Sequence, residues 1–309
     1  MPENCEGHDL LVKLKHKSPH RHEQIIERAR SEINSSHMLW RISGMAEGVT
    51  SYILGTVHIS SSRLQLLSQA TRNAILASRV VVLESRPISR AGHRRQMAHS
   101  IPLMLSRGKT LATVLDEDEL EVVEKALDAA GLAPELVHGL KPWAASMFLA
   151  RSRCEEIRQK AGLKPLDVVV AEFGTSNGLP LMGLESTLEQ YQAMASLPDD
   201  AQMAWLKSSI QLSNRLEDMT ETTARLYDDR LMPAIWDLTV DYSGEALSPA
   251  MLGVIRAALV DRRNLLMRDR AIPMLHHGAF IAVGALHLPG PGGLVNLLRE
   301  SGFTLSPVE

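Results

Sequence analysis

The stretch Tyr52-Ile53-Leu54-Gly55-Thr56-Val57-His58 is an apolar run that ends in a histidine, and it predicts the first strand of the unit that determines the fold. Apolar residues then recur at helical spacing from Leu64 to Ala77, and the run Val80-Val81-Val82-Leu83-Glu84 follows. A continuous β-branched run is typical of a strand that is buried on both faces. Residues 51–84 therefore predict a strand, a helix and a parallel strand joined by a right-handed crossover.

The motif Gly-x-x-His occurs a second time near the other end of the chain. Gly284-Ala285-Leu286-His287 closes the apolar run Ala279–Val283, and a third run, Leu179–Leu184, ends in a glutamate. Parallel strands have their carboxyl ends at one edge of a sheet, and ligands gather there. The polar side chains expected at this edge are His58, Glu84, Glu185 and His287.

The remaining chain predicts a large helical portion around this sheet. Leu39-Trp40-Arg41-Ile42 predicts a hairpin with the strand that follows it, and Asp116 with Glu119 predicts a capping box at a helix start. We predict an α/β fold with a mixed, mainly parallel sheet in a domain spanning residues 37–309. Helical insertions are expected near 88–178 and 187–277, and residues 1–36 are expected to form a polar, flexible leader.

Composition excludes several classes of protein. A formal net charge of −3 over 309 residues gives no electrostatic case for a nucleic-acid partner. No run of about 18 apolar residues predicts an integral membrane segment, and no signal-peptide pattern opens the chain, so the cytoplasm is the default location. Cys5 and Cys154 match no zinc or disulfide spacing, and two free thiols are expected. The sequence gives no signal for the oligomeric state.

The four strand-end side chains predict a metal site. Imidazole and carboxylate together suit manganese, cobalt, iron or zinc, and no thiolate is present to select zinc. A divalent ion there would lower the pKa of bound water and polarise a carbonyl. We expect His58 and His287 as ligands, Glu84 as a ligand or general base, and Glu185 as a group that orients a ligand or carries a proton.

The same residues also allow other interpretations. Glycine at each motif also relieves crowding between a strand and a helix, and either glutamate could instead cap the next element. Arg263-Asn264 could anchor a substrate carboxylate or carbonyl through the guanidinium fork, or could belong to a solvated, charged helix face. No nucleophile elbow, Walker loop or His-Glu-x-x-His helix is present, which excludes the commonest hydrolase, nucleotide-binding and zincin sites.

At these positions the sequence resembles the TraB/GumN family, which is related to the Tiki metalloproteases. Besides the two histidine motifs and Val82-Leu83-Glu84, the resemblance covers residues 37–307 in the family's order. Its further matching pieces are Leu39-Trp40, Lys141-Pro142-Trp143, Leu166-Asp167, Leu184-Glu185 with Gln190, Arg263-Asn264, Leu288-Pro289-Gly290 with Gly293-Leu294, and Gly302-Phe303-Thr304-Leu305.

The resemblance implies a fold shared with erythromycin-esterase-like and ChaN-like proteins. For the Tiki branch it implies metal-dependent hydrolysis of a peptide or protein substrate, with Mn²⁺ or Co²⁺ favoured and Zn²⁺ as a further candidate. It places the functional histidines at His58 and His287 and the acid at Glu84. Two rival functions remain: a regulatory protein of the TraB type that binds a peptide, haem or signal in conjugation or pheromone control, and a metal-free esterase with His58 as its base.

Overall fold

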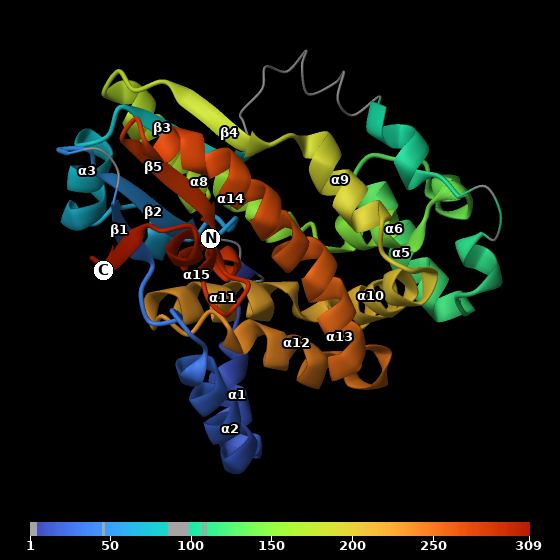
Figure 1. Ribbon diagram of the computed structural model, residues 1–309. Coiled ribbons are helices and arrows are strands. Elements are labelled where there is room, and N and C mark those ends of the chain that lie inside the picture. Colours follow the sequence, from blue (N-terminus) through green and yellow to red (C-terminus); the bar gives the residue numbers. More distant parts are fainter. Residues whose placement is uncertain (1–4, 45–46, 86–98, 107, 109) are drawn as a thin grey trace.

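The computed structural model describes residues 5–44, 47–85, 99–106, 108 and 110–309, and a six-stranded sheet lies at its centre (Figure 1). The strand order is β4-β3-β5-β2-β1-β6. The pairs β2–β5, β5–β3 and β3–β4 are parallel, whereas β1 is antiparallel to both β2 and β6. The predicted mixed, mainly parallel sheet is therefore confirmed. The strands are β1 (Leu39–Ser43), β2 (Ser51–Thr56), β3 (Val80–Ser85), β4 (Leu181–Glu185), β5 (Ala279–Gly284) and β6 (Thr304–Pro307).

The predicted strand–helix–strand unit forms, with two differences from the sequence pattern. A 3-10 turn occupies Ser62–Leu64, and α3 (Gln69–Leu76) begins later than expected because the Ser68 hydroxyl caps its first turn. In addition, β5 lies between β2 and β3, so that Ala282 is the register partner of both flanking strands. The two Gly-x-x-His motifs therefore follow adjacent strands.

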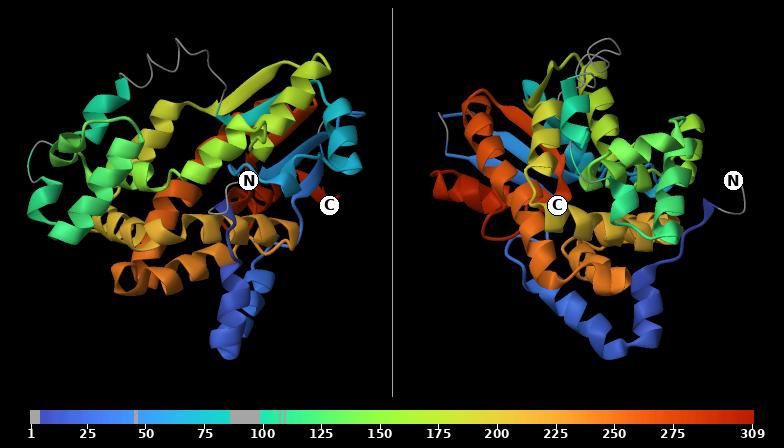
Figure 2. Two further views of the ribbon diagram at one scale, coloured as in Figure 1. Left: turned by 180° about the vertical axis from the view of Figure 1, so that it is seen from behind. Right: turned by 90° about the vertical axis from the view of Figure 1, so that its right-hand side faces the viewer.

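Helices cover both faces of the sheet, and alternate strand residues enter two separate cores. On one face Val81, Leu83 and Phe280 pack with α3 and α8 (Leu166–Ser176), and α8 is seen in front of the strands when the molecule is viewed from behind (Figure 2). On the other face Val82 and Ile281 pack with α14 (Arg262–Leu275) and α15 (Leu294–Glu300). Burial on both faces accounts for the uninterrupted apolar runs in the sequence.

The expected helical portion forms a lobe beside the sheet with a core of its own. The core is centred on Trp143, Leu127 and Leu206, all of which are fully buried. The capping box of Asp116 and Glu119 is confirmed. Residues 88–98, 107 and 109 of the first expected insertion lie outside the described residues. Further helices are α5 (Glu117–Ala129), α6 (Pro142–Leu149), α7 (Arg153–Lys160), α9 (Thr187–Ala195), α10 (Asp199–Leu212), α11 (Leu216–Asp228), α12 (Ala234–Ser243) and α13 (Pro249–Arg256).

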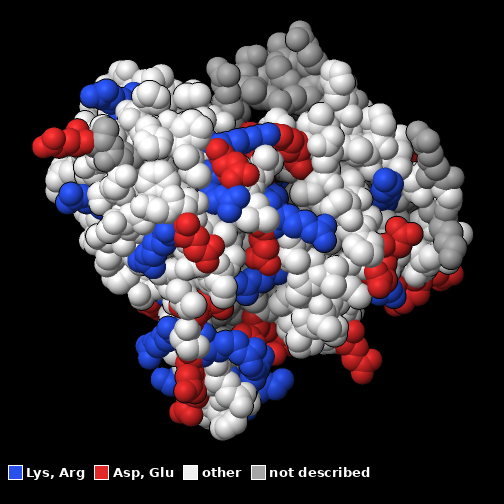
Figure 3. Space-filling model, viewed as in Figure 1, with Lys and Arg blue, Asp and Glu red and all other residues white. Residues whose placement is uncertain are grey.

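The N-terminal segment differs from the flexible leader that we expected. It forms a helical hairpin of α1 (Leu10–Lys17) and α2 (Pro19–Ser31), which projects from the body in Figure 1. Leu10 and Ile25 are fully buried, because the few apolar residues of this segment share one face at helical spacing. The remaining faces are charged, and Figure 3 shows basic side chains gathered on the hairpin.

The prediction of two free thiols is wrong. Cys5 and Cys154 form a disulfide across a sequence separation of 149 residues, with their Cα atoms 5.4 Å apart. The pairing depends on the N-terminal segment crossing the helical lobe, which no spacing between two cysteines can reveal. None of the described helices has the length and apolar character that crossing a bilayer requires.

Candidate functional site

The strand ends bring the four predicted side chains to one edge of the sheet. Glu84 is the next-to-last residue of β3, Glu185 ends β4, and His58 follows β2 after one residue. His287 comes from the 3-10 turn that follows β5. Both imidazole Nε2 atoms face Glu84 Oε2, at 3.9 Å for His58 and 3.8 Å for His287. Two nitrogens so close to one oxygen lie less than about 8 Å apart, which is within the limit beyond which they could not share an ion.

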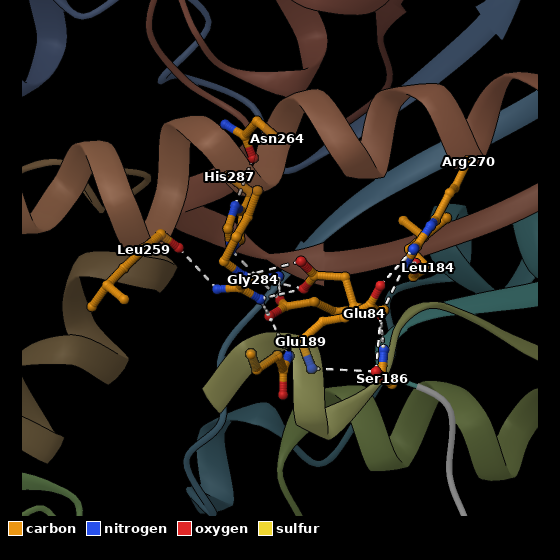
Figure 4. A network of polar contacts seen from close by, with 12 residues as sticks. Glu84, Leu184, Ser186, Glu189, Leu259, Asn264, Arg270, Gly284 and His287 are labelled. Atoms are coloured by element: carbon orange, nitrogen blue, oxygen red, sulfur yellow. Dashed lines mark hydrogen bonds and ion pairs between the residues drawn. The ribbon is translucent and has the colours of Figure 1, made fainter. Parts of the chain in front are cut away.

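His287 is held in one orientation by Asn264 (Figure 4). The Asn264 amide nitrogen donates to the Gly292 carbonyl oxygen at 2.7 Å, so the amide oxygen accepts from His287 Nδ1 at 2.6 Å. The proton therefore belongs on Nδ1, and burial lowers the pKa of the ring to about 4. In a neutral ring of this tautomer, Nε2 presents a lone pair to Glu84.

His58 has a matching outer partner but a different environment. Its Nδ1 lies 3.2 Å from Asp167 Oδ1, and 58% of its side chain is exposed, against 6% for His287. The Asp167 carboxylate, followed by that of Glu84, raises the pKa of His58 to about 10. Thus the two histidines of the repeated motif differ in charge, because one is paired with an acid and the other is buried beside an amide.

Glu84 is the shared partner of the site. The Gly284 N–H donates to Oε2 at 2.8 Å, while Oε1 accepts from the Gln190 amide at 3.2 Å. Burial raises the pKa of the Glu84 carboxyl, but the contacts with His58, His287 and Arg263 outweigh it and hold that pKa well below 4.5. Glu84 is therefore an anion that donors and cations surround.

Arg263 forms ion pairs with both buried glutamates and does not belong to a solvated helix face. Its Nη2 pairs with Glu84 Oε1 and with Glu185 Oε2, the latter at 2.6 Å, and its Nη1 donates to the Leu259 carbonyl oxygen at 2.9 Å. A π-helical turn, Ala257–Asp261, precedes it and shifts the helix register at this point. These contacts occupy the guanidinium fork, and the role of Arg263 as a substrate anchor stays a prediction.

A pocket of about 270 Å³ opens beside these groups. Sequence reasoning did not assign a role to two of its polar residues, Asp167 on α8 and Gln190 on α9. Both lie in the first turn of a helix, where polar residues are ordinary, so only the resemblance pointed to them. The pocket is lined by Thr56, His58, Leu83, Glu84, Ser85, Asp167, Gln190 and Ala282.

The donor chemistry fits a divalent ion, although the spacing is wide. Two imidazole nitrogens and a carboxylate oxygen face one another, and each ring contacts an oriented partner through its other nitrogen, as in many metal sites. Donors about 2.1 Å from one tetrahedral ion are about 3.4 Å apart, which is shorter than the contacts seen here. Accordingly, within the described residues no group of three or more His, Cys, Asp or Glu side chains is arranged to hold an ion.

Comparison with known proteins agrees with the resemblance in the sequence. Curated relatives include the "Uncharacterized protein YbaP" of Escherichia coli (strain K12) and of Shigella flexneri, each 26% identical over 189 residues, or 60% of this chain. The chain spans 66% of the length of these relatives. No solved structure matches it. The model of the TraB/PrgY/gumN family matches residues 38–307, so the chain belongs to that family.

Proposed function

We propose that the protein is a metal-dependent hydrolase of peptide amide bonds. The observation that carries the proposal is the pair of imidazole nitrogens directed at one carboxylate oxygen, 3.8 and 3.9 Å away. His58, His287 and Glu84 would hold the ion, with Mn²⁺ or Co²⁺ as the leading candidates and Zn²⁺ as a third. When bound, such an ion supplies an acidified water and a polarised carbonyl.

The surrounding residues suggest how the roles divide. A low pKa makes Glu84 a poor proton acceptor near neutrality, which favours it as a ligand over a general base. Arg263 and Gln190 fix its Oε1, so that Oε2 stays directed at the histidines. Glu185 holds Arg263 in place from a position that is 4% exposed, which makes it a positioning residue.

The exposed side of the site suggests where the substrate enters. His58 is the exposed imidazole, and it shares the pocket with Asp167 and Gln190. A peptide approaching through this pocket meets His58 and Asp167 before it reaches the buried Glu84 and His287. We therefore assign the binding of the scissile amide to the His58 side of the site.

The test measures metal content and peptide cleavage together. Wild type, incubated with Mn²⁺ or Co²⁺ and then desalted, should retain the ion and cleave peptides from a random library. His287→Ala should lose both properties, while His277→Ala, which removes an exposed histidine beyond α14, should keep both. Equal metal content and equal cleavage in wild type and His287→Ala would show that the proposal is wrong.

The wide donor spacing favours one rival, a regulatory protein that binds a peptide, haem or signal without turnover. Tight binding that survives a chelator, with no cleavage, would support this alternative. The metal-free esterase is weaker, because a pKa of about 10 leaves His58 protonated near neutrality and unable to act as a base. Ester hydrolysis that is insensitive to chelators would be its signature.

A further inference from the structure

The disulfide joins the N-terminal strap, residues 5–9, to α7. Both cysteines are buried, and beside them Arg158 on α7 donates to the Cys5 carbonyl oxygen at 3.2 Å. Further along the strap, the His8 N–H donates to Asp218 on α11 at 2.7 Å. Gly7 passes so close to α11 that an added Cβ would lie 2.0 Å from the Glu217 carbonyl oxygen. The strap therefore clamps α7 against α11.

Glu217 on α11 completes the clamp through its side chain. One of its carboxylate oxygens pairs with Arg158 and the other with the Ser152 hydroxyl, which also caps the start of α7. Arg158 is 8% exposed, so these partners offset the cost of burying its charge. The position of α7 thus follows the state of the strap.

The same short helix also contacts the loop that carries His58. Glu155 is the residue after Cys154, and its two carboxylate oxygens share the Ser60 N–H as a donor, at 2.9 Å and 3.1 Å. Ser60 is fully buried and lies two residues after His58, in the loop that follows β2. A single helix therefore connects the disulfide to the backbone that carries the exposed histidine.

We propose that reduction of the Cys5–Cys154 disulfide regulates the site by releasing α7 from the strap and loosening the loop that carries His58. In the reaction, a thiolate of a small or protein dithiol attacks one sulfur and forms a mixed disulfide. The second thiol of the donor then resolves it, leaving two cysteine thiols and an oxidised donor. Because both cysteines are buried, attack follows transient lifting of the strap.

The two halves of the site should respond differently to reduction. The loop of His58 is held by Glu155, whereas His287 is held by Asn264 on α14, a helix on the other face of the sheet. Reduction should therefore move His58 and leave His287 in place. The regulation of catalysis rests on the proposed function, but this structural asymmetry does not.

The test compares imidazole NMR signals, assigned with His58→Ala and His287→Ala, in oxidised protein and in protein reduced with dithiothreitol. The His58 signal should shift or broaden on reduction, while the His287 signal stays unchanged. Glu155→Gln should alter the His58 signal in the oxidised protein, and Glu156→Gln, the neighbouring acid that pairs with Arg151, should not. If the protein is a peptidase, reduction should lower its activity at least about tenfold, as loss of an outer partner does at metal sites.

Two results would overturn the inference. One is an unchanged His58 signal on reduction and in Cys5→Ser. The other is collapse of every histidine signal on reduction, which would make the bond a requirement for folding rather than a switch. A shifted His58 signal without any peptidase activity in either state would instead refute the proposed function and leave the coupling intact.

Discussion

Replacing Arg263 by methionine is the sharpest test of how the site is held together. The guanidinium is 14% exposed and contacts Glu84 and Glu185, whose side chains are 10% and 1% exposed. Methionine keeps much of the side-chain volume and removes the charge. Two buried carboxylates would then lie together without a cation.

The magnitude follows from the contacts that are lost. Hydrogen bonds to charged groups contribute about 1.5–3 kcal/mol each, and Arg263 makes such bonds to both carboxylates. Part of this gain is offset, because burying the guanidinium itself costs free energy. Removing one partner of a buried ion pair typically costs about 3–5 kcal/mol, and we expect Arg263→Met to lower the free energy of unfolding by that amount.

The assay is urea denaturation near neutral pH, with Arg262→Met as the control. Arg262 is exposed on the same helix, and its replacement should change stability by less than about 0.5 kcal/mol. Adding Glu185→Gln to Arg263→Met should recover part of the loss, because one unpaired charge disappears. A loss below about 1 kcal/mol for Arg263→Met, or no recovery in the double variant, would refute this account of the buried network.

Three further predictions concern single positions. Gly284→Ala places a methyl group 3.3 Å from the Glu84 carboxylate, so the amount of metal that stays bound after desalting should fall. Gly253→Ala is the control glycine, in open space on α13, and it should add about 0.5–1 kcal/mol to the free energy of unfolding. Asn264→Ala frees the imidazole that it orients, and calorimetric titration should show Mn²⁺ binding weakened about 10–100-fold. Glu189→Gln removes a carboxylate whose pKa its arginine partner, Arg270, lowers from 4.5 to about 2. Its cost of about 1 kcal/mol should be complete above pH 4.5 and vanish as the pH falls through about 2, and a cost independent of pH would contradict this assignment.

The strand ends could be predicted because local chemistry determines them. A β-branched run that stops at Glu84 is typical of a buried strand, and the capping box at Asp116 needs no distant partner. The order of the strands is different, since β5 is placed between β2 and β3 by pairing across more than 190 residues. The sequence pattern identifies which segments form strands, but it does not identify which parallel strands lie next to each other in the sheet.

The contacts that distant helices make with the strand-end residues could not be predicted from local sequence patterns either. The polar residues Asp167 and Gln190 carry no local mark of a role, and only the family resemblance singled them out. Arg263 was a candidate as a substrate anchor, but its ion pairs with Glu84 and Glu185 were not predicted. The disulfide required knowing that residues 5–9 cross α7. In each case the missing information was which segments pack against each other, and tertiary packing alone supplies it.

The contacts around Glu84 indicate that the site has a function and does not exist only to stabilise the fold. Oε1 already has Arg263 and Gln190, and Oε2 already has the Gly284 N–H, so the carboxylate is satisfied without the histidines. A buried lone pair of His287 directed at that oxygen adds repulsion, and Asn264 keeps it there. Stability alone would favour an apolar residue at this position. Two acceptors held face to face, with outer partners that prevent either from turning away, are explained when a cation or a shared proton lies between them.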